Sequence, residues 1–553
     1  MFDRHFQVWP ENLPRTLQLP QTCLYTNLAV TAMRYPDHNA IIYYDTPITY
    51  RMLQEQVDAL AGYLMQQGVQ KGDRVLLYMQ NAPQFIISFY AILRANAVVV
   101  PINPMNRAAE LDHYLHDTGA SIAIASQEVA PYILGKIGSH QLEHVIVAAY
   151  NDYIKVATDL MLPEEVAERA QPITEAGAIS WQDALAQQLT PGPLVVGPDD
   201  LAVFPYSSGT TGAPKGCMHT HRSVMATCVQ GSLWTENTSE SVILATLPYF
   251  HVTGMQGSMN SPIYSGSTIV LMTRWNREVA AQLIERYRVG RWVNIVTMAI
   301  DLLSDPSVKS YDLSSLENVG GGGAAMPEAI SNKLMELTGL RYMEGYGLSE
   351  TMAGTHINPT SKPKAQCLGI PVFDVDAQIY DSDTGKLLDV GEVGEIILSA
   401  PQVFQGYWNL PQETEEAFIN VNGKQFFRTG DMGYYDEEGY FFIVDRLKRM
   451  INASGYKVWP AEVEGMLYHH PAVQQACVIS TPDERRGETV KACVVLRESV
   501  KDVSENDIIE WARGQMAAYK VPRVVEFRSS LPLSPTGKVL WRAMQEEEWG
   551  KME

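Results

Sequence analysis

The sequence predicts an α/β protein: a large N-terminal domain of helix-covered β-sheets with an antiparallel β subdomain, followed by a small α+β domain. Three observations support this prediction: the length of 553 residues, an alternation of short apolar runs with helical patterns, and a change of pattern towards the C-terminus. A chain of this length exceeds what one hydrophobic core organises, so we expect at least two domains. Hydrophobic residues make up 46% of the chain and charged residues 19%, which is typical of globular proteins.

Short β-branched runs predict the buried strands of the large domain. They cover residues 73–81, 97–103, 121–126, 144–149, 201–209, 241–248 and 267–272. Amphipathic patterns at 52–68 and 109–119 predict helices between them. Because strands that alternate with helices form parallel sheets covered by those helices, we expect such sheets in this domain.

The pattern changes at residues 372–443, where short strands are separated by Gly and Asp turns, as in GEVGEIILS. This pattern predicts an antiparallel subdomain that completes the large domain. We place the domain boundary at 445–448, so that the domains are 1–444 and 449–553. In the small domain, AEVEGMLYHH and SENDIIEWARGQM predict helices, and AVQQACVIS and VKACVVL predict strands.

Composition restricts the classes of function. The formal net charge of -21 disfavours nucleic acid, whose phosphates the protein would repel. The six cysteines are scattered without metal-ligand spacing, which favours reduced structural thiols. No apolar run is long enough for a transmembrane helix, and the charged, proline-containing start lacks the apolar core of a secretory signal. We therefore expect a cytoplasmic enzyme; homodimerisation and transient membrane contact remain open.

The most informative motif is YSSGTTGAPKG at residues 206–216. Its glycines let the backbone N–H groups approach phosphate oxygens, its hydroxyls add donors, and Lys215 adds a positive charge. It is not a Walker A loop, because no Ser or Thr follows the lysine. The motif predicts a phosphate-binding loop rather than an ordinary polar turn, with Ser207, Thr210, Thr211 and Lys215 as candidate ligands.

This loop resembles the signature of the adenylate-forming (AMP-binding) superfamily, which includes acyl-CoA synthetases, luciferases and peptide-synthetase adenylation domains. Further motifs of the family follow in order as far as Lys538. The chain is identified as a member of the acyl-CoA synthetase branch, similar to medium- and long-chain fatty acid–CoA ligases. The resemblance implies ATP, Mg²⁺ and coenzyme A, and two steps: an acid and ATP give acyl-AMP and pyrophosphate, and the acyl group then passes to the CoA thiol.

The segment YGLSET, residues 346–351, resembles the family's second nucleotide motif. Tyr346 offers a flat face for adenine, and Thr351 a hydroxyl for the α-phosphate. Glu350 is a hard oxygen ligand for Mg²⁺, with Thr210 as the second candidate. Just upstream, the glycine-rich residues 320–327 present backbone without side chains. The resemblance puts this strip, including Gly322, beside the adenine and the acyl chain.

Residues 428–431, RTGD, match the family's ribose motif. A carboxylate can accept from both ribose hydroxyls, so Asp431 is the candidate, and Arg446 is a second candidate for the ribose. The resemblance also implies that the small domain is mobile, rotating about a hinge at Lys448 between adenylation and thioester formation. Gly455 and Lys457 are implied on the thiolation side of that domain.

Lys538 ends the motif LSPTGK near the C-terminus. A lysine on a loop is usually a solvated surface residue, but the motif gives it a role in adenylation. One ammonium group can neutralise the carboxylate and the α-phosphate as they approach each other. The candidate catalytic residues are therefore Lys538, Glu350, Thr351 and His251.

His251 belongs to PYFHVTGM, residues 248–255, which matches the substrate-side motif. Amino-acid-activating relatives carry an Asp there; its absence leaves a substrate ammonium unpaired and disfavours amino acids. His251 itself is either a gate near the carboxylate or a packed core histidine. Acetate-specific relatives carry Trp at the position of Gly347, so glycine implies an open pocket.

Four methionines flank these motifs: Met255, Met259, Met298 and Met352. Flexible thioethers suit a variable apolar ligand, although each methionine on its own is as readily a core residue. Together these features predict a medium- or long-chain aliphatic acid, with an aryl acid as the alternative.

Three other functions remain open: transfer to a carrier-protein thiol, oxidation of the adenylate as in luciferases, and nucleotide binding without chemistry. The joint presence of Lys538, Glu350 and Asp431 argues against the last, because binding of AMP alone does not require Lys538.

Overall fold

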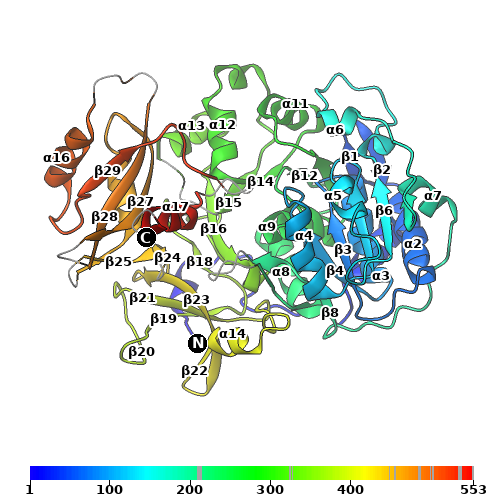
Figure 1. Cartoon of the computed structure of the whole chain (residues 1–553), viewed down its shortest axis with the longest axis horizontal. Coiled ribbons are helices and arrows are strands. Elements are labelled where there is room, and N and C mark those ends of the chain that lie inside the picture. The colour runs from blue at the N-terminus through cyan, green and yellow to red at the C-terminus, as the bar shows by residue number, and fades with distance from the viewer. Residues whose placement is uncertain are drawn as a thin grey trace. The chain divides into compact units, whose positions relative to one another are not determined.

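Two mainly parallel β-sheets form the framework of the N-terminal part of the chain (Figure 1). The computed structural model describes residues 1–207, 214–322, 326, 328–446, 449–453, 456–483, 487–497, 500, 503–533 and 539–550. The chain divides into a large unit, residues 1, 3–376 and 398–427, and a C-terminal unit, residues 2, 377–397 and 428–553. The predicted boundary at 445–448 stays a prediction.

The first sheet of the large unit has nine strands among the described residues. Their order is β18 (Ile370–Pro371), β17 (Ala353–Ile357), β16 (Met343–Leu348), β15 (Asn318–Gly322), β14 (Arg291–Ile295), β12 (Val242–Ala245), β13 (Thr268–Leu271), β1 (Asn39–Tyr43) and β2 (Thr46–Thr49). The strands from β16 to β1 pair in parallel, and antiparallel strands flank them on both sides.

The second sheet has seven strands within the described ranges. Their order is β11 (His219–Thr220), β8 (Leu201–Val203), β4 (Val98–Ile102), β3 (Arg74–Tyr78), β5 (Ile122–Ser126), β6 (His144–Ala148) and β7 (Ala178–Ser180). All pairs but the first are parallel. The predicted parallel sheets are thus confirmed. A separate two-stranded hairpin joins β9 (Tyr206–Ser207) and β10 (Lys215–Gly216).

Helices cover both faces of the second sheet. The inward side chains of β3, such as Val75 and Leu77, pack with α2 and α3, whereas Leu76 and Tyr78 face a second cluster with α4 and α5. The α-helices of the large unit are α1 (Tyr25–Arg34), α2 (Tyr50–Gln66), α3 (Pro83–Arg94), α4 (Ala108–Thr118), α5 (Ala130–Leu134), α6 (Glu164–Ala167), α7 (Trp181–Ala186), α8 (His221–Trp234), α9 (Val252–Met255), α10 (Ser261–Ser265), α11 (Arg277–Tyr287), α12 (Val296–Ser304), α13 (Glu328–Thr338) and α14 (Pro411–Glu416).

Several helices begin at residues that cap them. The Thr49 hydroxyl accepts from the Met52 N–H at the start of α2, and Thr220 does the same for Ser223 at the start of α8.

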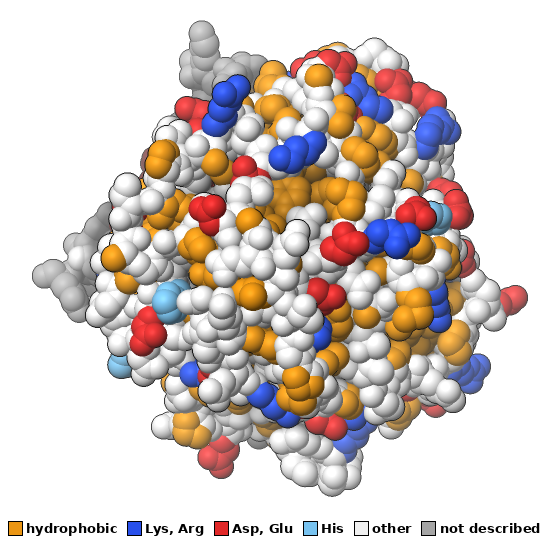
Figure 2. All heavy atoms as spheres, turned by 90° about the vertical axis from the view of Figure 1, so that its right-hand side faces the viewer, with side chains coloured by type: hydrophobic (Ala, Val, Ile, Leu, Met, Phe, Trp, Pro, Cys, Tyr) orange, Lys and Arg blue, Asp and Glu red, His pale blue; other side chains and the backbone are white. Residues whose placement is uncertain are grey.

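None of the helices in the described ranges combines the length and the hydropathy needed to cross a bilayer. On the face of the large unit in Figure 2, basic and acidic side chains are interspersed rather than gathered by sign.

One predicted strand is wrong. Residues 201–209 were expected to form a single strand, but β8 ends at Val203 and β9 begins at Tyr206. Pro205 lies between them and cannot donate to a strand ladder, so the chain leaves the sheet there. Ser208 and Gly209 lie outside the described residues.

The C-terminal unit is built on antiparallel strands. Its first sheet contains β19 (Asp376–Asp381), β20 (Lys386–Leu387), β21 (Gly394–Ser399), β23 (Lys424–Tyr435) and β24 (Phe441–Arg446); β22 (Phe418–Val421) forms a hairpin with the beginning of β23. The second contains β26 (Tyr456–Val458), β25 (Ile451–Ala453), β28 (Gly487–Leu496), β27 (Val473–Asp483) and β29 (Val524–Phe527). Three helices accompany it: α15 (Pro460–Leu467), α16 (Glu505–Gln515) and α17 (Trp541–Gly550).

Candidate active site

The predicted phosphate loop is carried by the hairpin of β9 and β10. Ser207 pairs with Lys215 across the hairpin, so both ends of the loop are fixed relative to each other. Thr210 and Thr211 lie outside the described residues. The loop follows the hairpin strand β9, which Pro205 separates from the sheet strand β8.

Hydrogen bonds from α4 anchor this hairpin. The Tyr206 hydroxyl donates to Asp117 Oδ2 at 2.6 Å, and His113 Nε2 lies 2.8 Å from the Pro214 carbonyl oxygen. Burial, and next the Asp117 carboxylate, raise the pKa of Tyr206 above its ordinary value, so the phenol stays protonated and keeps donating. The hairpin base is therefore rigid on both strands.

A buried lysine, an aromatic ring and a buried carboxylate lie in series beside the loop. Lys215 Nζ lies 5.2 Å from the centre of the Tyr407 ring, within the range of a cation–π contact. The Tyr407 hydroxyl donates to Glu350 Oε1 at 2.9 Å. Lys215 and Glu350 are 9% and 8% exposed, so both charges are held in a largely dehydrated setting. The structure thus brings together the predicted phosphate lysine and the predicted Mg²⁺ ligand.

Tyr407 is a residue that the sequence analysis missed. It bridges to Cys217, the residue after β10, as an isolated antiparallel pair, and Trp408 N donates to the Gly216 carbonyl at 2.8 Å. The only local signal is the aromatic pair in QGYWN, residues 405–409, which by itself resembles any aromatic turn.

The turn η5 (Ser349–Thr351), which carries Glu350, is held from two sides and lies against β9. His219 Nε2 bonds the Ser349 carbonyl at 2.8 Å, and the Glu350 carbonyl accepts from Phe404 N at 2.8 Å. Burial lowers the pKa of His219 to about 4, so its imidazole is neutral at pH 7. In the neutral ring Nε2 carries the proton and Nδ1 accepts from Ser223 Oγ at 3.1 Å.

The hydroxyl of Thr351 is used within the protein. It accepts from Leu348 N at 2.9 Å and donates to the Ala353 carbonyl at 2.9 Å, and the residue is fully buried. Because a hydroxyl has one proton, a hydrogen bond to a phosphate would require it to leave the Ala353 carbonyl. The α-phosphate role of Thr351 stays a prediction, and the structure assigns the residue a turn-forming role.

Residues 320–322 of the glycine strip lie on β15, and Tyr346 lies on its parallel neighbour β16. A Cβ atom at Gly322 would lie 2.5 Å from the Gly345 carbonyl oxygen, so only glycine allows this approach of the two strands. The Tyr346 ring lies 5.7 Å from the His356 ring at an angle of 56°. The close approach of the two strands therefore requires glycine at position 322, in addition to the place beside the adenine and the acyl chain that the resemblance implies.

A close backbone contact, which the sequence did not reveal, requires glycine at position 347. A Cβ atom there would lie 1.8 Å from the Ala353 carbonyl oxygen of β17, closer than any side chain tolerates. Any larger side chain at this position must therefore displace β17. The open pocket expected at Gly347 stays a prediction. Of the four methionines near the motifs, Met255, Met259 and Met352 are fully buried in the core of the large unit.

His251 caps α9 and is half-buried, with its Nδ1 3.4 Å from Thr253 N. The turn before it is clamped by Asn81, which the sequence analysis missed: Nδ2 donates to the Leu247 carbonyl and Oδ1 accepts from Tyr249 N, both at 2.8 Å. A π-helix, Gln256–Asn260, separates α9 from α10. Such segments frequently occur at functional sites, but the gate role of His251 stays a prediction.

In the C-terminal unit the predicted ribose residues are cross-strand partners. Asp431 on β23 lies opposite Arg446 on β24, and Arg446 Nε lies 2.8 Å from Asp431 Oδ1. Asp431 is fully buried, and the guanidinium compensates its charge. Lys457 lies on β26, but its side chain is outside the described residues, as are Gly455 and Lys538.

The predicted hinge residue Lys448 is also outside the described residues, but both flanks of the hinge are described. Asp445 Oδ2 accepts from Ala461 N at 2.6 Å in the first turn of α15. Arg449 bonds Glu464 on the same helix. Both flanks are therefore tied to the same helix, α15, and the hinge at Lys448 stays a prediction.

Among the described residues no cluster of three or more His, Cys, Asp or Glu side chains is suited to hold a metal. A single buried carboxylate fits Mg²⁺ that enters with a nucleotide, because this ion usually takes one or two protein carboxylates and completes its shell with phosphate oxygens and water. Glu350 beside Lys215 meets that requirement; Thr210, the other candidate ligand, is not described.

A pocket of about 380 Å³ lies elsewhere in the large unit, at the edge strand β7. Gln127, Asp152 and Trp181 are among its lining residues, and none of the predicted site residues lines it. We therefore do not connect this pocket with the motifs.

The sequence profile of the AMP-binding enzyme family matches residues 28–408, and that of the family's C-terminal domain matches residues 462–538. The chain is 36% identical over 548 residues to the long-chain-fatty-acid–CoA ligase of Bacillus subtilis (strain 168), covering 98% of this chain and 97% of the relative. It is 32% identical over 507 residues to the feruloyl-CoA synthase of Amycolatopsis sp, covering 91% and 95%.

Among solved structures, ATP-bound MatB from Rhodopseudomonas palustris is similar with a TM-score of 0.84 at 26% identity, covering 95% of this chain and 98% of that one. The predicted fold and the resemblance carried by the motifs are both confirmed. With profile matches to both of its domains and relatives aligned over nearly the whole chain, the protein belongs to the AMP-binding enzyme family.

Proposed function

We propose that the protein is an ATP-dependent acyl-CoA ligase that converts a medium- or long-chain fatty acid to acyl-AMP and pyrophosphate, and then to acyl-CoA and AMP. The observation that carries the proposal is the series Lys215, Tyr407 and Glu350, which sets a buried cation and a buried carboxylate around one tyrosine at the base of the predicted phosphate loop. The nearly complete alignment with a long-chain-fatty-acid–CoA ligase supports the substrate class.

In the first step the acid carboxylate attacks the α-phosphorus of ATP, and pyrophosphate leaves. Lys215 and the loop residues Ser207, Thr210 and Thr211 hold the phosphates. Glu350 is held in place by Tyr407 and would bind Mg²⁺, which neutralises phosphate charge when bound. Lys538 stabilises the charge that develops between the carboxylate and the α-phosphate.

The nucleoside part of ATP has its own residues in the proposal. Asp431 accepts from the ribose hydroxyls while Arg446 compensates the buried carboxylate, and Tyr346 faces the adenine. In the second step the CoA thiol attacks the acyl carbonyl and AMP leaves, with Gly455 and Lys457 on the thiolation side. The cytoplasmic location expected from the sequence stays a prediction.

An aryl acid is the second candidate substrate, because the chain is 32% identical to a feruloyl-CoA synthase over most of its length. The two candidates differ in what the acyl site must bury. A flexible alkyl chain gains binding free energy with each buried methylene, whereas a planar ring requires one pocket of fixed shape.

The substrate proposal predicts a steep dependence on chain length. Each buried methylene contributes up to about 0.8 kcal/mol, so six extra methylenes give octanoate up to about 5 kcal/mol over acetate. Chain ordering subtracts from this gain, so we expect kcat/KM to rise by at least about 100-fold from acetate to the best C8–C12 acid. The measurement is AMP release with CoA across acetate, butanoate, octanoate, decanoate and dodecanoate.

Benzoate, ferulate and alanine complete that series. The proposal expects all three to be poorer than octanoate, with alanine inactive. If benzoate or ferulate exceeds every aliphatic acid, the aryl alternative is correct; if acetate is best, the open pocket inferred from the motifs does not exist.

The proposed hinge gives a second prediction. Proline fixes φ and removes a donor, so Lys448→Pro limits the rotation that the proposed hinge must absorb. We expect acyl-AMP formation to persist while thioester formation from added acyl-AMP and CoA falls by at least about 10-fold. The two half-reactions are measured separately.

The matched control is Glu505→Pro. Glu505 is the exposed first residue of α16, a position where proline is tolerated, and both half-reactions should stay as in the native enzyme. Unchanged CoA transfer in Lys448→Pro would place the hinge at another residue.

A further inference from the structure

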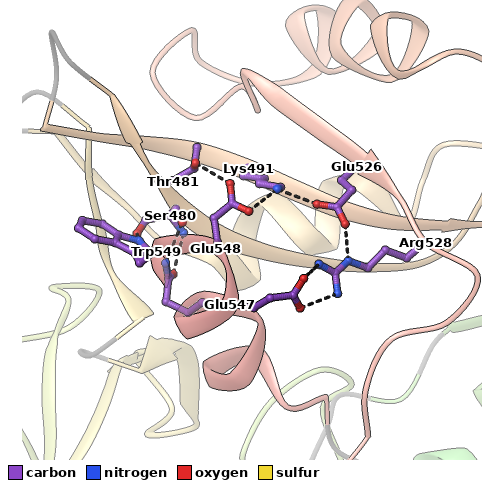
Figure 3. A network of polar contacts seen from close by, with 9 residues as sticks. Ser480, Thr481, Lys491, Glu526, Arg528, Glu547, Glu548 and Trp549 are labelled. Atoms are coloured by element: carbon purple, nitrogen blue, oxygen red, sulfur yellow. Dashed lines mark hydrogen bonds and ion pairs between the residues drawn. The ribbon is translucent and has the colours of Figure 1, made fainter. Parts of the chain in front are cut away.

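The last helix, α17, follows Lys538 in the chain and is fastened to the edge of the C-terminal sheet (Figure 3). Gln545 makes two hydrogen bonds to the backbone of Ser480 on β27: Oε1 accepts from N at 2.8 Å, and Nε2 donates to O at 2.7 Å. Trp549 Nε1 donates to Ser480 Oγ at 3.1 Å. These contacts fix the helix along one strand.

A buried lysine fastens the same helix to the neighbouring strand. Lys491 on β28 is 5% exposed, and its Nζ lies 2.6 Å from Glu548 Oε2 of α17 and 2.7 Å from Glu526 Oε2 of β29 (Figure 3). Thr481 Oγ1 donates to the other oxygen of Glu548 at 2.7 Å. Burial alone lowers the pKa of Lys491, but the two carboxylates outweigh it and hold the pKa above its ordinary value.

Arg528 extends this network to the next residue of the helix. Its Nε lies 2.7 Å from Glu526 Oε1, and its terminal nitrogens lie 3.3 Å and 3.2 Å from the two oxygens of Glu547. Two cations from the sheet region therefore share three carboxylates, two of which belong to α17. Such a network loses more than one contact when its central cation is removed.

The loop that contains Lys538 begins and ends at paired residues. Leu533 and Val539 form an antiparallel bridge, and Leu540 N donates to the Pro532 carbonyl at 2.8 Å. Val539 and Trp541 pack against a small buried cluster that includes Met544 of α17. The C-terminal end of the loop thus runs directly into the helix that Lys491 holds.

We propose that Lys491 is a positioning residue for the adenylation step: through Glu548 it fixes α17, and through α17 it fixes Val539, the residue that follows Lys538 in the chain. The proposal rests on the proposed function, in which Lys538 stabilises charge during acyl-AMP formation. Lys491 contacts no substrate; it acts through the placement of another side chain. A displacement of about 1 Å at a reacting group can cost about 100-fold in rate, so such placement matters.

The test compares Lys491→Met with the native enzyme in both half-reactions. Methionine keeps an unbranched side chain, one atom shorter than lysine, but leaves Glu526 and Glu548 without their shared cation. We expect acyl-AMP formation to fall by at least about 10-fold, while thioester formation from added acyl-AMP and CoA is retained. Lys491→Arg, which keeps the charge, should recover most of the adenylation rate.

Two further variants separate positioning from general destabilisation. Gln545→Ala removes the hydrogen bonds to Ser480 without leaving a buried charge, and should also slow adenylation selectively. Lys520→Met removes an ion pair between Lys520 and Glu462 in the same unit, away from α17, and should leave both half-reactions unchanged. A loss in Lys491→Met that affects both half-reactions alike would overturn the proposal.

The double variant Lys491→Met/Lys538→Ala gives the most specific result. If Lys491 acts through Lys538, the double variant is no slower in adenylation than Lys538→Ala alone; multiplied losses contradict the proposal. If Lys538→Ala itself leaves adenylation unchanged, the proposed function of the loop fails and the positioning role fails with it. If Lys538→Ala slows adenylation but Lys491→Met does not, only the positioning role fails.

Discussion

Replacing Lys538 by alanine should slow acyl-AMP formation by roughly 10²–10³-fold, the usual loss when one charge-stabilising donor is removed from a reacting centre. The physical reason is that the carboxylate and the α-phosphate both carry negative charge. Apart from Lys215 of the phosphate loop, Lys538 is the lysine that the motifs assign to this step. Thioester formation from added acyl-AMP should persist, because that step does not bring the two anions together. The measurement is pyrophosphate release, followed by CoA thioester formation in a separate assay.

The control for this substitution is Lys520→Ala, a lysine of the same unit that pairs with Glu462 on α15. It should leave both half-reactions as they are. Equal losses in both half-reactions of Lys538→Ala would refute the assigned role, because they would indicate a damaged unit rather than a missing charge.

Glu350→Gln should reduce acyl-AMP formation by about 10²–10³-fold and raise the Mg²⁺ concentration needed for half-maximal rate. The amide keeps the size of the side chain and can still accept from the Tyr407 hydroxyl, which now bonds Glu350 Oε1 at 2.9 Å. What it loses is the negative charge that Mg²⁺ prefers in a ligand. The rate is measured against Mg²⁺ concentration at fixed ATP.

Glu415→Gln is the matched control, because Glu415 is an exposed carboxylate on α14 of the same unit. It should change neither the rate nor the Mg²⁺ dependence. A Glu350→Gln enzyme with unchanged Mg²⁺ dependence would show that this carboxylate is not the ligand, whatever its effect on rate.

The sequence predicted well where structure follows from local pattern. Strands such as β3 and β5 lie within the predicted runs because apolar, β-branched residues there are buried on both faces. Helix α3 was not predicted, since its residues Pro83–Leu93 are all buried and a helix buried on every side has no clear amphipathic period to read. The single strand predicted across 201–209 was wrong, because strand pairing in the sheet stops before Pro205 although the apolar run continues.

The candidate site was predictable to the extent that it lies within continuous motifs. Lys215 and Glu350 were found in this way, and the structure brings both into contact with Tyr407. Tyr407 and Asn81 were not, because their partners are distant in sequence: Glu350 is 57 residues from Tyr407, and Tyr249 is 168 from Asn81. Gly347 was interpreted through a ligand pocket, although the carbonyl of Ala353 alone requires glycine there.

The most direct test of the central claim is acid-dependent exchange of labelled pyrophosphate into ATP, followed by product analysis with CoA. With decanoate and Mg²⁺ but without CoA, we expect exchange, because acyl-AMP forms reversibly on the enzyme. On addition of CoA we expect AMP and decanoyl-CoA in equal amounts. Absence of acid-dependent exchange together with ADP and phosphate as products would contradict the account, because the acid would then be activated by a route other than adenylation.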